Sequence, residues 1–285
     1  MIAAVPLASG KGPRDENFPV ASRLVAARHR PVVLAFYRVA RMADDIADHA
    51  SAAPNDKFAR LADIEATLLG GNDLVAEAAD LRQALASRAL STQHMLDLLE
   101  AFRRDVVKAR YADWAELMDY CRYSAAPVGR FMLDVHGEGQ AAWAASDALC
   151  AALQVINHLQ DCGKDYRELN RIYLPMSALT AAGLGAETLS AARASPALRE
   201  VLAGLAAQTG TLLARARPLA GAIRDWRLSL EIGVIHRLAV SLNGRLMRRD
   251  PLSQRVHHRP IEALGVALHG AGLAAWARRH RRAEA

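Results

Sequence analysis

Apolar positions recur at helical spacing along most of the chain from Asn17 onward, interrupted by short segments rich in Gly, Pro, Ser or Asn. These breaks fall at 51–55, 70–73, 137–140, 173–175, 183–185, 195–196 and 250–251. Between them the pattern predicts roughly eight to ten helices, several longer than the average of about 11–12 residues. No alternating strand pattern of any length is present. The sequence therefore predicts an all-α helix bundle.

The amino-acid composition supports this prediction and also indicates a large hydrophobic core. Of the 285 residues, 52% are hydrophobic, and Ala and Leu dominate while aromatic residues make up 5%. Such a composition suits helices that bury broad apolar faces, with room for a central apolar cavity. No linker divides the chain, so we expect a single domain over 1–285, with residues 1–15 as a disordered leader and 278–285 as a basic tail.

Charge and cysteine content narrow the partners and the compartment. The net charge of +6 comes mostly from Arg, which suits nucleic acid, anionic lipid or a diphosphate. No nucleic-acid motif accompanies it, so we expect no nucleic acid partner. Three cysteines without metal-ligand spacing predict a reducing cytoplasm. No signal peptide and no apolar run of about 18 residues is present, so the sequence predicts a protein that is soluble or lies on a membrane surface.

The first candidate for chemistry is an acidic pair at the end of an apolar stretch. Asp44 and Asp48 are four residues apart, so on a helix both carboxylates project from one face. The preceding residues, 31–43, are largely apolar, which predicts a mostly buried helix. Like charges late in a buried helix need a positive partner between them.

A second acidic pair has the same design. Asp161 and Asp165 stand four residues apart after the apolar run 148–153. Asn157 and Gln154 continue the same stripe toward the N-terminus. Two such helices facing one cavity could hold Mg²⁺, which prefers carboxylate, water and phosphate oxygens, with a diphosphate bridging the metal.

A single Asp-x-x-x-Asp is usually a solvated helix face, and a single arginine is usually a surface residue. The pairing of two such motifs, each after an apolar run, favours the metal site. Arg41 precedes the first pair, and Arg167 and Arg171 follow the second. Guanidinium groups suit diphosphate oxygens, so these three are candidate substrate contacts.

With these motifs in order, the chain resembles the squalene/phytoene synthase family from roughly Glu16 to Asn243. The motifs are Tyr37 with Arg41-x-x-Asp44-Asp45-x-x-Asp48, Tyr120 with Pro127-Val128-Gly129, Gln154-x-x-Asn157-x-x-x-Asp161-x-x-x-Asp165, and Arg171-Ile172-Tyr173-Leu174-Pro175. The resemblance implies an all-α isoprenoid-synthase fold and an enzyme that acts on a prenyl diphosphate with Mg²⁺.

The resemblance also implies roles for individual residues. Metal ligands are expected at Asp44, Asp48, Asn157, Asp161 and Asp165, and the four aspartates are the expected catalytic residues. Substrate contacts are expected at Asn17, Phe18, Tyr37, Arg41, Gln154, Asn157, Arg167, Arg171 and Tyr173.

Within the family, the segments 16–22 and 165–167 resemble the hydroxysqualene synthase branch of bacterial hopanoid pathways. Enzymes of that branch are carbon–oxygen lyases acting on phosphates: they ionise presqualene diphosphate, rearrange the cation and add water. Gln160 stands where the family commonly has arginine, which removes one diphosphate-facing charge. We hypothesise that this loss alters how the diphosphate is held.

Two alternatives remain open. One is a prenyltransferase of the same family that condenses two farnesyl or geranylgeranyl diphosphates to presqualene diphosphate, squalene or phytoene. The other is a non-catalytic assembly or binding relative, for which eroded aspartates would be expected, whereas all four are intact.

Three further features have more than one interpretation. His158 could position a water, although a histidine in a polar cluster is more often a hydrogen-bonding neighbour, and Tyr120 could stabilise cations or simply pack. The segment 261–282 is either a basic amphipathic helix at the inner face of the membrane or an ordinary terminal helix. On the branch prediction, a presqualene diphosphate synthase hands over the substrate.

Overall fold

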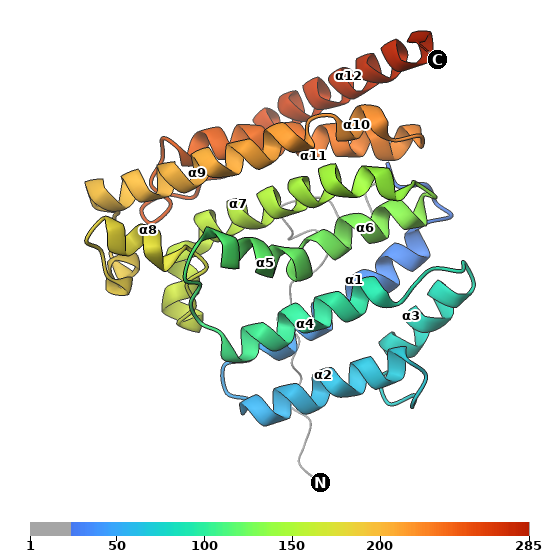
Figure 1. Ribbon diagram of the computed structural model, residues 1–285, viewed down its shortest axis with the longest axis horizontal. Coiled ribbons are helices and arrows are strands. Elements are labelled where there is room, and N and C mark those ends of the chain that lie inside the picture. The colour runs from blue at the N-terminus through green and yellow to red at the C-terminus, as the bar shows by residue number, and fades with distance from the viewer. Residues whose placement is uncertain (1–23, 285) are drawn as a thin grey trace. The chain divides into compact units, whose positions relative to one another are not determined.

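The computed structural model describes residues 24–284, and every helix or strand assigned in that range is a helix (Figure 1). The prediction of an all-α protein is therefore confirmed. Within these residues the single extended pairing is an isolated bridge between Arg110 and Ile172. The predicted leader, residues 1–15, lies outside the described range, whereas residues 278–284 of the predicted basic tail continue the last helix.

The chain forms two compact units, with the boundary between Val107 and Lys108. The described helices of the first unit are α1 (Arg30–Asp48), α2 (Pro54–Leu68), α3 (Ala76–Ala86) and α4 (Gln93–Val107). Helix α1 packs against the other three, and α2 also packs against α3 and α4. The core of the first unit consists of aliphatic side chains such as Val39, Leu61 and Leu99, which are fully buried.

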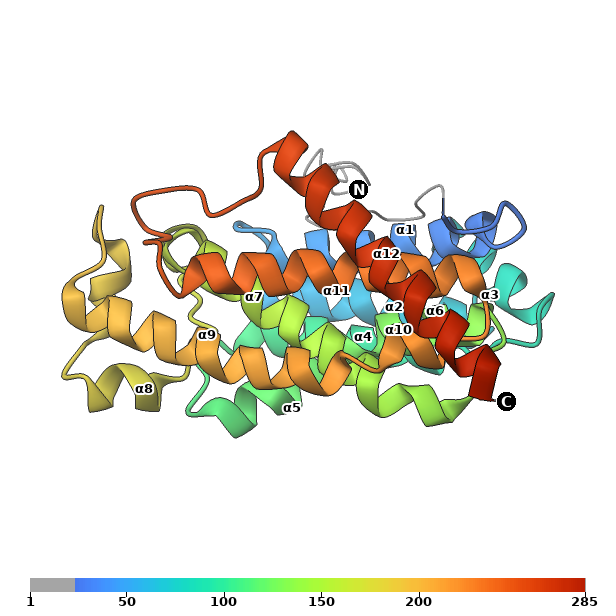
Figure 2. The same ribbon diagram turned by 90° about the horizontal axis from the view of Figure 1, so that it is seen from above.

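The second unit is built around α7. Its elements are α5 (Trp114–Ser124), α6 (Ala126–Val135), η1 (Gln140–Ala142), α7 (Trp143–Leu169), α8 (Met176–Ala181), η2 (Ala186–Ser190), α9 (Pro196–Ala216), α10 (Leu219–Ala222), α11 (Trp226–Leu246) and α12 (Pro260–Glu284). Helix α7, with 27 residues, packs against α5, α6, α9 and α11. Helix α12 crosses α11 and also contacts α10 (Figure 2).

Helix ends in the second unit follow local sequence chemistry. The Asp113 side chain caps α5, Ser195 caps α9, and Asp225 caps α11, each by accepting a hydrogen bond from a backbone N–H of the first turn. Helix α7 ends because Asn170 takes a left-handed conformation with φ of 49°, which Asn tolerates better than most residues. The end of α7, just after the second acidic pair, is therefore set locally.

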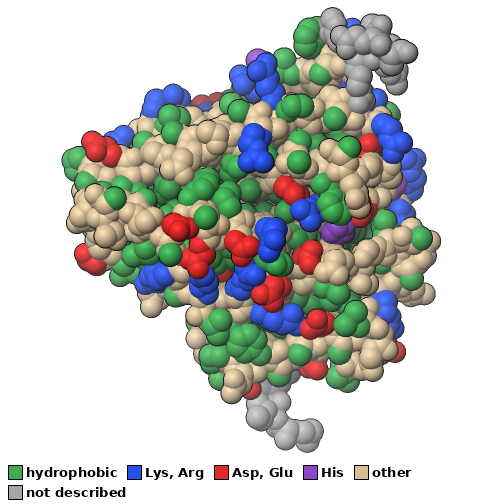
Figure 3. Space-filling view, viewed as in Figure 1, with side chains coloured by type: hydrophobic (Ala, Val, Ile, Leu, Met, Phe, Trp, Pro, Cys, Tyr) green, Lys and Arg blue, Asp and Glu red, His purple; other side chains and the backbone are tan. Residues whose placement is uncertain are grey.

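Helix α12 is held by a close backbone contact and leaves apolar side chains uncovered. A Cβ atom on Gly270 would overlap the carbonyl oxygen of Gly233, so the two helix backbones touch at this point. Figure 3 shows hydrophobic side chains interspersed with charged ones on the face that it draws. The outer side of α12 exposes five large apolar side chains: Ile261, Leu264, Leu268, Leu273 and Trp276. None of the described helices combines the length and the apolar character that a bilayer crossing requires.

Candidate active site

The first acidic motif lies in the last turns of α1, within the first unit. Val39, Ala43 and Ile46 are buried and direct one side of α1 into the core. Asp44 and Asp48 are half-buried, and 36% of the Asp44 side chain remains accessible. The carboxylates therefore lie at the rim of the core, where a cation can reach them.

Charges crowd around Asp44. Arg41 Nη1 lies 2.9 Å from Asp44 Oδ2, and Arg41 Nη2 donates to Asp45 Oδ1 at 2.5 Å. Burial, together with the negative charges of Asp48 and Asp105, raises the pKa of Asp44 to about 7, although Arg41 acts to lower it. A cluster of carboxylates that resists full ionisation at neutral pH is the kind of site that a divalent cation stabilises.

Asp105 of α4 was not singled out by the sequence analysis. Only 8% of the residue is exposed, although its side chain is a carboxyl group. It occupies the apolar stripe of α4, four residues after Ala101 and seven after Leu98, both of which are buried. A charge on the core-facing side of an amphipathic helix was the signal that could have revealed it.

The second acidic motif forms one accessible stripe along α7, within the second unit. Gln154, Asn157, Asp161 and Asp165 are all half-buried and follow the helical spacing of three or four residues. Most side chains on the other sides of these turns, including His158, Leu159 and Cys162, are buried, whereas Lys164 is exposed. The packing of α7 therefore turns its amide and carboxylate groups toward one open side.

An aromatic cluster lies behind this stripe. The His158 imidazole stacks on the Tyr173 ring with centroids 3.6 Å apart, and Tyr111 and Tyr120 complete the cluster. Burial, together with the charge of Arg171, lowers the pKa of His158 to about 3, so the imidazole is neutral. A hydrogen bond of 3.1 Å joins His158 Nε2 to Gln154 Nε2. His158 is thus a hydrogen-bonding neighbour of the polar stripe.

The predicted arginine contacts differ in their surroundings. Arg171 is buried, and its Nη1 donates to the Tyr173 hydroxyl at 3.0 Å, whereas Arg167 is exposed on α7. Tyr37 is half-buried on α1, one turn before Arg41. The predicted contacts at Asn17 and Phe18 lie outside the described residues.

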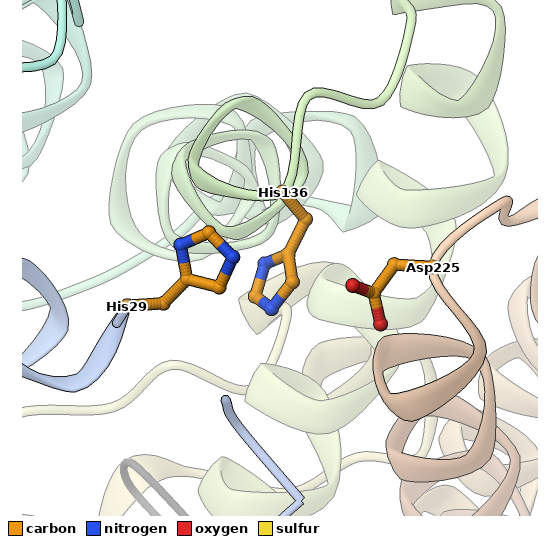
Figure 4. Close-up of side chains that lie close together, drawn as sticks. All are labelled: His29, His136 and Asp225. Carbon is orange, nitrogen blue, oxygen red and sulfur yellow. The ribbon is translucent and has the colours of Figure 1, made fainter. Parts of the chain in front are cut away.

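Figure 4 draws a different group of side chains, His29 of the first unit and His136 and Asp225 of the second. In the second unit, the Asp225 carboxylate accepts hydrogen bonds from the first backbone N–H groups of α11. The His136 ring Nδ1 lies 2.8 Å from the Met132 carbonyl oxygen at the end of α6. In the first unit, His29 is the N-cap residue of α1, but its side chain makes no capping hydrogen bond and instead accepts one of 3.1 Å at Nε2 from Arg28 Nε.

The donor atoms of both acidic motifs fit magnesium. Helix α1 offers carboxylate oxygens, and α7 offers carboxylate and amide oxygens, the ligand types that Mg²⁺ takes in proteins. Softer metals would favour thiolate or imidazole. Burial raises the pKa of the Cys162 thiol to about 12, and it keeps its proton. The oxygen atoms are therefore the available ligands.

Comparisons with known proteins agree with the helical fold and identify the family. The squalene/phytoene synthase family model matches residues 12–262. Hydroxysqualene synthase of Rhodopseudomonas palustris is 56% identical over 271 residues, which cover 95% of this chain and 92% of that protein. Hydroxysqualene synthase of Sinorhizobium fredii is 52% identical over 275 residues, covering 94% of this chain and 93% of that protein.

A solved structure is also similar. The crystal structure of squalene synthase HpnC from Alicyclobacillus acidocaldarius has a TM-score of 0.72 and 31% sequence identity, and the match covers 80% of this chain and 87% of that one. The family consists of synthases that process prenyl diphosphates, generally with a divalent metal. The chain therefore belongs to the squalene/phytoene synthase family of enzymes that use isoprenoid diphosphates.

Proposed function

We propose that the protein is a hydroxysqualene synthase that converts presqualene diphosphate to hydroxysqualene and diphosphate. The carbon–oxygen bond breaks and diphosphate leaves with the bonding electrons. The cyclopropylcarbinyl cation rearranges, a water molecule adds to it, and the adduct loses a proton. The observation that carries this proposal is the 56% identity, over 95% of the chain, to a protein of that name.

In this proposal the two acidic motifs bind Mg²⁺ and the neighbouring polar residues bind the diphosphate. Metal ligands are Asp44, Asp48, Asn157, Asp161 and Asp165. Substrate contacts are Asn17, Phe18, Tyr37, Arg41, Gln154, Asn157, Arg167, Arg171 and Tyr173. When bound, magnesium neutralises charge on the leaving diphosphate. Support comes from the accessible stripe of oxygen donors on α7 and from the crowded carboxylates around Asp44.

Aromatic and apolar groups supply the rest of the chemistry. The rings of Tyr120 and Tyr173 are electron-rich surfaces suited to stabilising a carbocation. Two cations already lie over rings of this buried cluster, Arg171 at 5.8 Å from the Tyr173 centroid and Lys108 at 5.0 Å from the Tyr111 centroid, whereas His158 is neutral. Exclusion of bulk water by buried apolar side chains limits capture of the cation before it rearranges.

We also propose a cytoplasmic location at the inner face of the membrane, with presqualene diphosphate supplied by a separate synthase. The exposed apolar side of α12, bordered by basic residues such as Arg259 and Arg279, supports this location. Lipid-like substrate and product would partition into the same membrane.

The direct test is an incubation of the purified protein with Mg²⁺ and either presqualene diphosphate or farnesyl diphosphate, followed by mass spectrometry of the extracted lipids. Hydroxysqualene is expected from presqualene diphosphate alone. Asp44→Asn and Asp161→Asn should abolish it, whereas Asp80→Asn, an exposed change on α3, should not. Consumption of farnesyl diphosphate would move the protein to the condensing branch, and no turnover of either substrate would favour a non-catalytic relative.

A further inference from the structure

Residues 250–259, which make up most of the segment that joins α11 to α12, are held by hydrogen bonds at both ends. At its start, the Asp250 carboxylate accepts a hydrogen bond of 3.0 Å from the backbone N–H of Ala194. Near its end, Arg245 Nη1 donates to the backbone carbonyl oxygen of His257 at 2.9 Å. We call this segment the α11–α12 linker. Its path is set by specific contacts even though it contains no regular secondary structure.

The middle of the linker lies on the acidic end of α7. Gln160 Nε2 donates to the Val256 carbonyl oxygen at 2.5 Å. A Cβ atom on Gly163 would lie 2.6 Å from Leu252 Cδ2, so the linker also packs directly on α7 at this glycine. Gln160 and Gly163 flank Asp161 and Cys162, and the linker therefore passes beside the second acidic motif.

This path brings a basic side chain to the motif. His257 follows the residue that Gln160 holds, and its imidazole is half-buried. Burial and the charge of Arg255 lower the pKa of His257, whereas the Asp161 carboxylate raises it. The imidazole and the Asp161 carboxylate are thus close enough to interact electrostatically.

Gln160 itself faces the linker. Only 8% of the residue is exposed, and its Oε1 atom is buried without a hydrogen-bond partner among the described residues. A neutral amide can donate to a backbone carbonyl at a buried position without the desolvation that a charged arginine would suffer. Gln160, which stands where the family commonly has arginine, therefore connects α7 to the linker by a hydrogen bond.

We propose that the α11–α12 linker is part of the diphosphate site: Gln160 holds it beside the second acidic motif, and His257 contacts a diphosphate bound at Asp161. The inference rests on the proposed function, because it requires that Asp161 takes part in binding diphosphate through magnesium. His257 is then a substrate-binding residue and Gln160 a positioning residue. The linker supplies a hydrogen-bonding imidazole beside the motif, where position 160 carries no arginine.

Binding of inorganic diphosphate in the presence of Mg²⁺, measured by calorimetry on the full chain, tests the contact without turnover. His257→Ala should weaken binding by roughly tenfold, as expected for a lost hydrogen bond to a charged group. His269→Ala, which changes an exposed histidine of α12, should bind as the unchanged protein does. Equal binding by His257→Ala and the unchanged protein would overturn the contact.

Limited trypsin digestion tests whether Gln160 holds the linker in place. Arg255, which precedes Val256, is an exposed cleavage site in the linker, and mass spectrometry identifies the cut after it. Gln160→Leu should increase the cleavage rate at Arg255 several-fold, and Mg²⁺ with diphosphate should slow it in the unchanged protein. Unaltered cleavage in Gln160→Leu would overturn the positioning role. If the unchanged protein fails to bind magnesium and diphosphate, or Asp161→Asn binds them equally well, the proposed function fails instead.

Discussion

Replacing His158 with phenylalanine should remove a pH-dependent part of the stability of the second unit. In the folded chain the imidazole is stacked on Tyr173 and buried, and its pKa is lowered to about 3. In the unfolded chain histidine titrates near 6.5. As pH falls below about 6.5, the unfolded state binds a proton that the folded state refuses, so the contribution of His158 to stability is present above that pH and lost below it.

The magnitude follows from the two pKa values. Between pH 7 and pH 5, protonation of the unfolded state at one histidine lowers the free energy of unfolding by about 2 kcal/mol. The unfolded pKa sets this figure, because pH 5 lies well above the folded pKa of His158. Other titrating groups add their own pH dependence, and they are common to the unchanged protein and the variant. The difference between the two proteins therefore isolates His158.

Tryptophan fluorescence gives a readout confined to the correct unit. All four tryptophans, Trp114, Trp143, Trp226 and Trp276, belong to the second unit, which also contains His158. Urea unfolding followed by this signal at pH 7, 6 and 5 yields the free energy of unfolding for each protein. The stability gap between the unchanged protein and His158→Phe should shift by about 2 kcal/mol over this range.

A suitable control is His269→Gln, because His269 is exposed on α12. Its stability difference from the unchanged protein should stay constant with pH. If the difference for His158→Phe were also constant from pH 7 to pH 5, the imidazole would be titrating in the folded chain. The argument that burial and stacking keep it neutral would then be wrong.

Three further predictions concern the metal site, a helix crossing and the thiols. Because the pKa of Asp44 is raised to about 7, Mg²⁺ binding at this motif should release protons, and its affinity should fall about tenfold from pH 8 to pH 6. Calorimetry in buffers of different ionisation enthalpy measures both effects. Equal affinity at the two pH values would contradict this prediction. Gly270→Ala should destabilise the second unit by roughly 1–3 kcal/mol in urea unfolding, because the added carbon overlaps α11. Gly272→Ala, which has open space, should not destabilise it. Cys121 and Cys162, whose buried thiols have pKa values of about 12, should resist iodoacetamide in the folded protein at neutral pH and react after unfolding; rapid reaction of the native chain would refute their burial.

Helical periodicity was sufficient to predict the fold class, but it gave too few elements. The described residues form twelve α-helices, whereas roughly eight to ten were expected. Breaks marked by Gly, Pro or Asn were recognisable, such as Pro196 at the start of α9. The break between α3 and α4 was missed because its left-handed residue is Ala89, with φ of 52°, and alanine carries no turn signal.

The candidate site was predictable where residues repeat at helical spacing. The stripe from Gln154 to Asp165 is visible in the sequence because it lies on one uninterrupted helix. Two contacts depend instead on how separate segments pack: the stacking of His158 on Tyr173 and the hydrogen bond from Gln160 to the α11–α12 linker. Such contacts are long-range and leave no local pattern. Residue roles across the acidic motifs remain predictions.

The close contact between Gly233 and Gly270 has an evolutionary consequence. Because α12 is attached to α11 through backbone atoms and small residues such as Ala274, its outer residues contribute little to folding. Natural selection on Leu264 and Leu268 would then depend on what this side of α12 contacts in the cell, and little on folding. In lineages with different lipids, we expect this outer side to diverge rapidly while the two glycines persist.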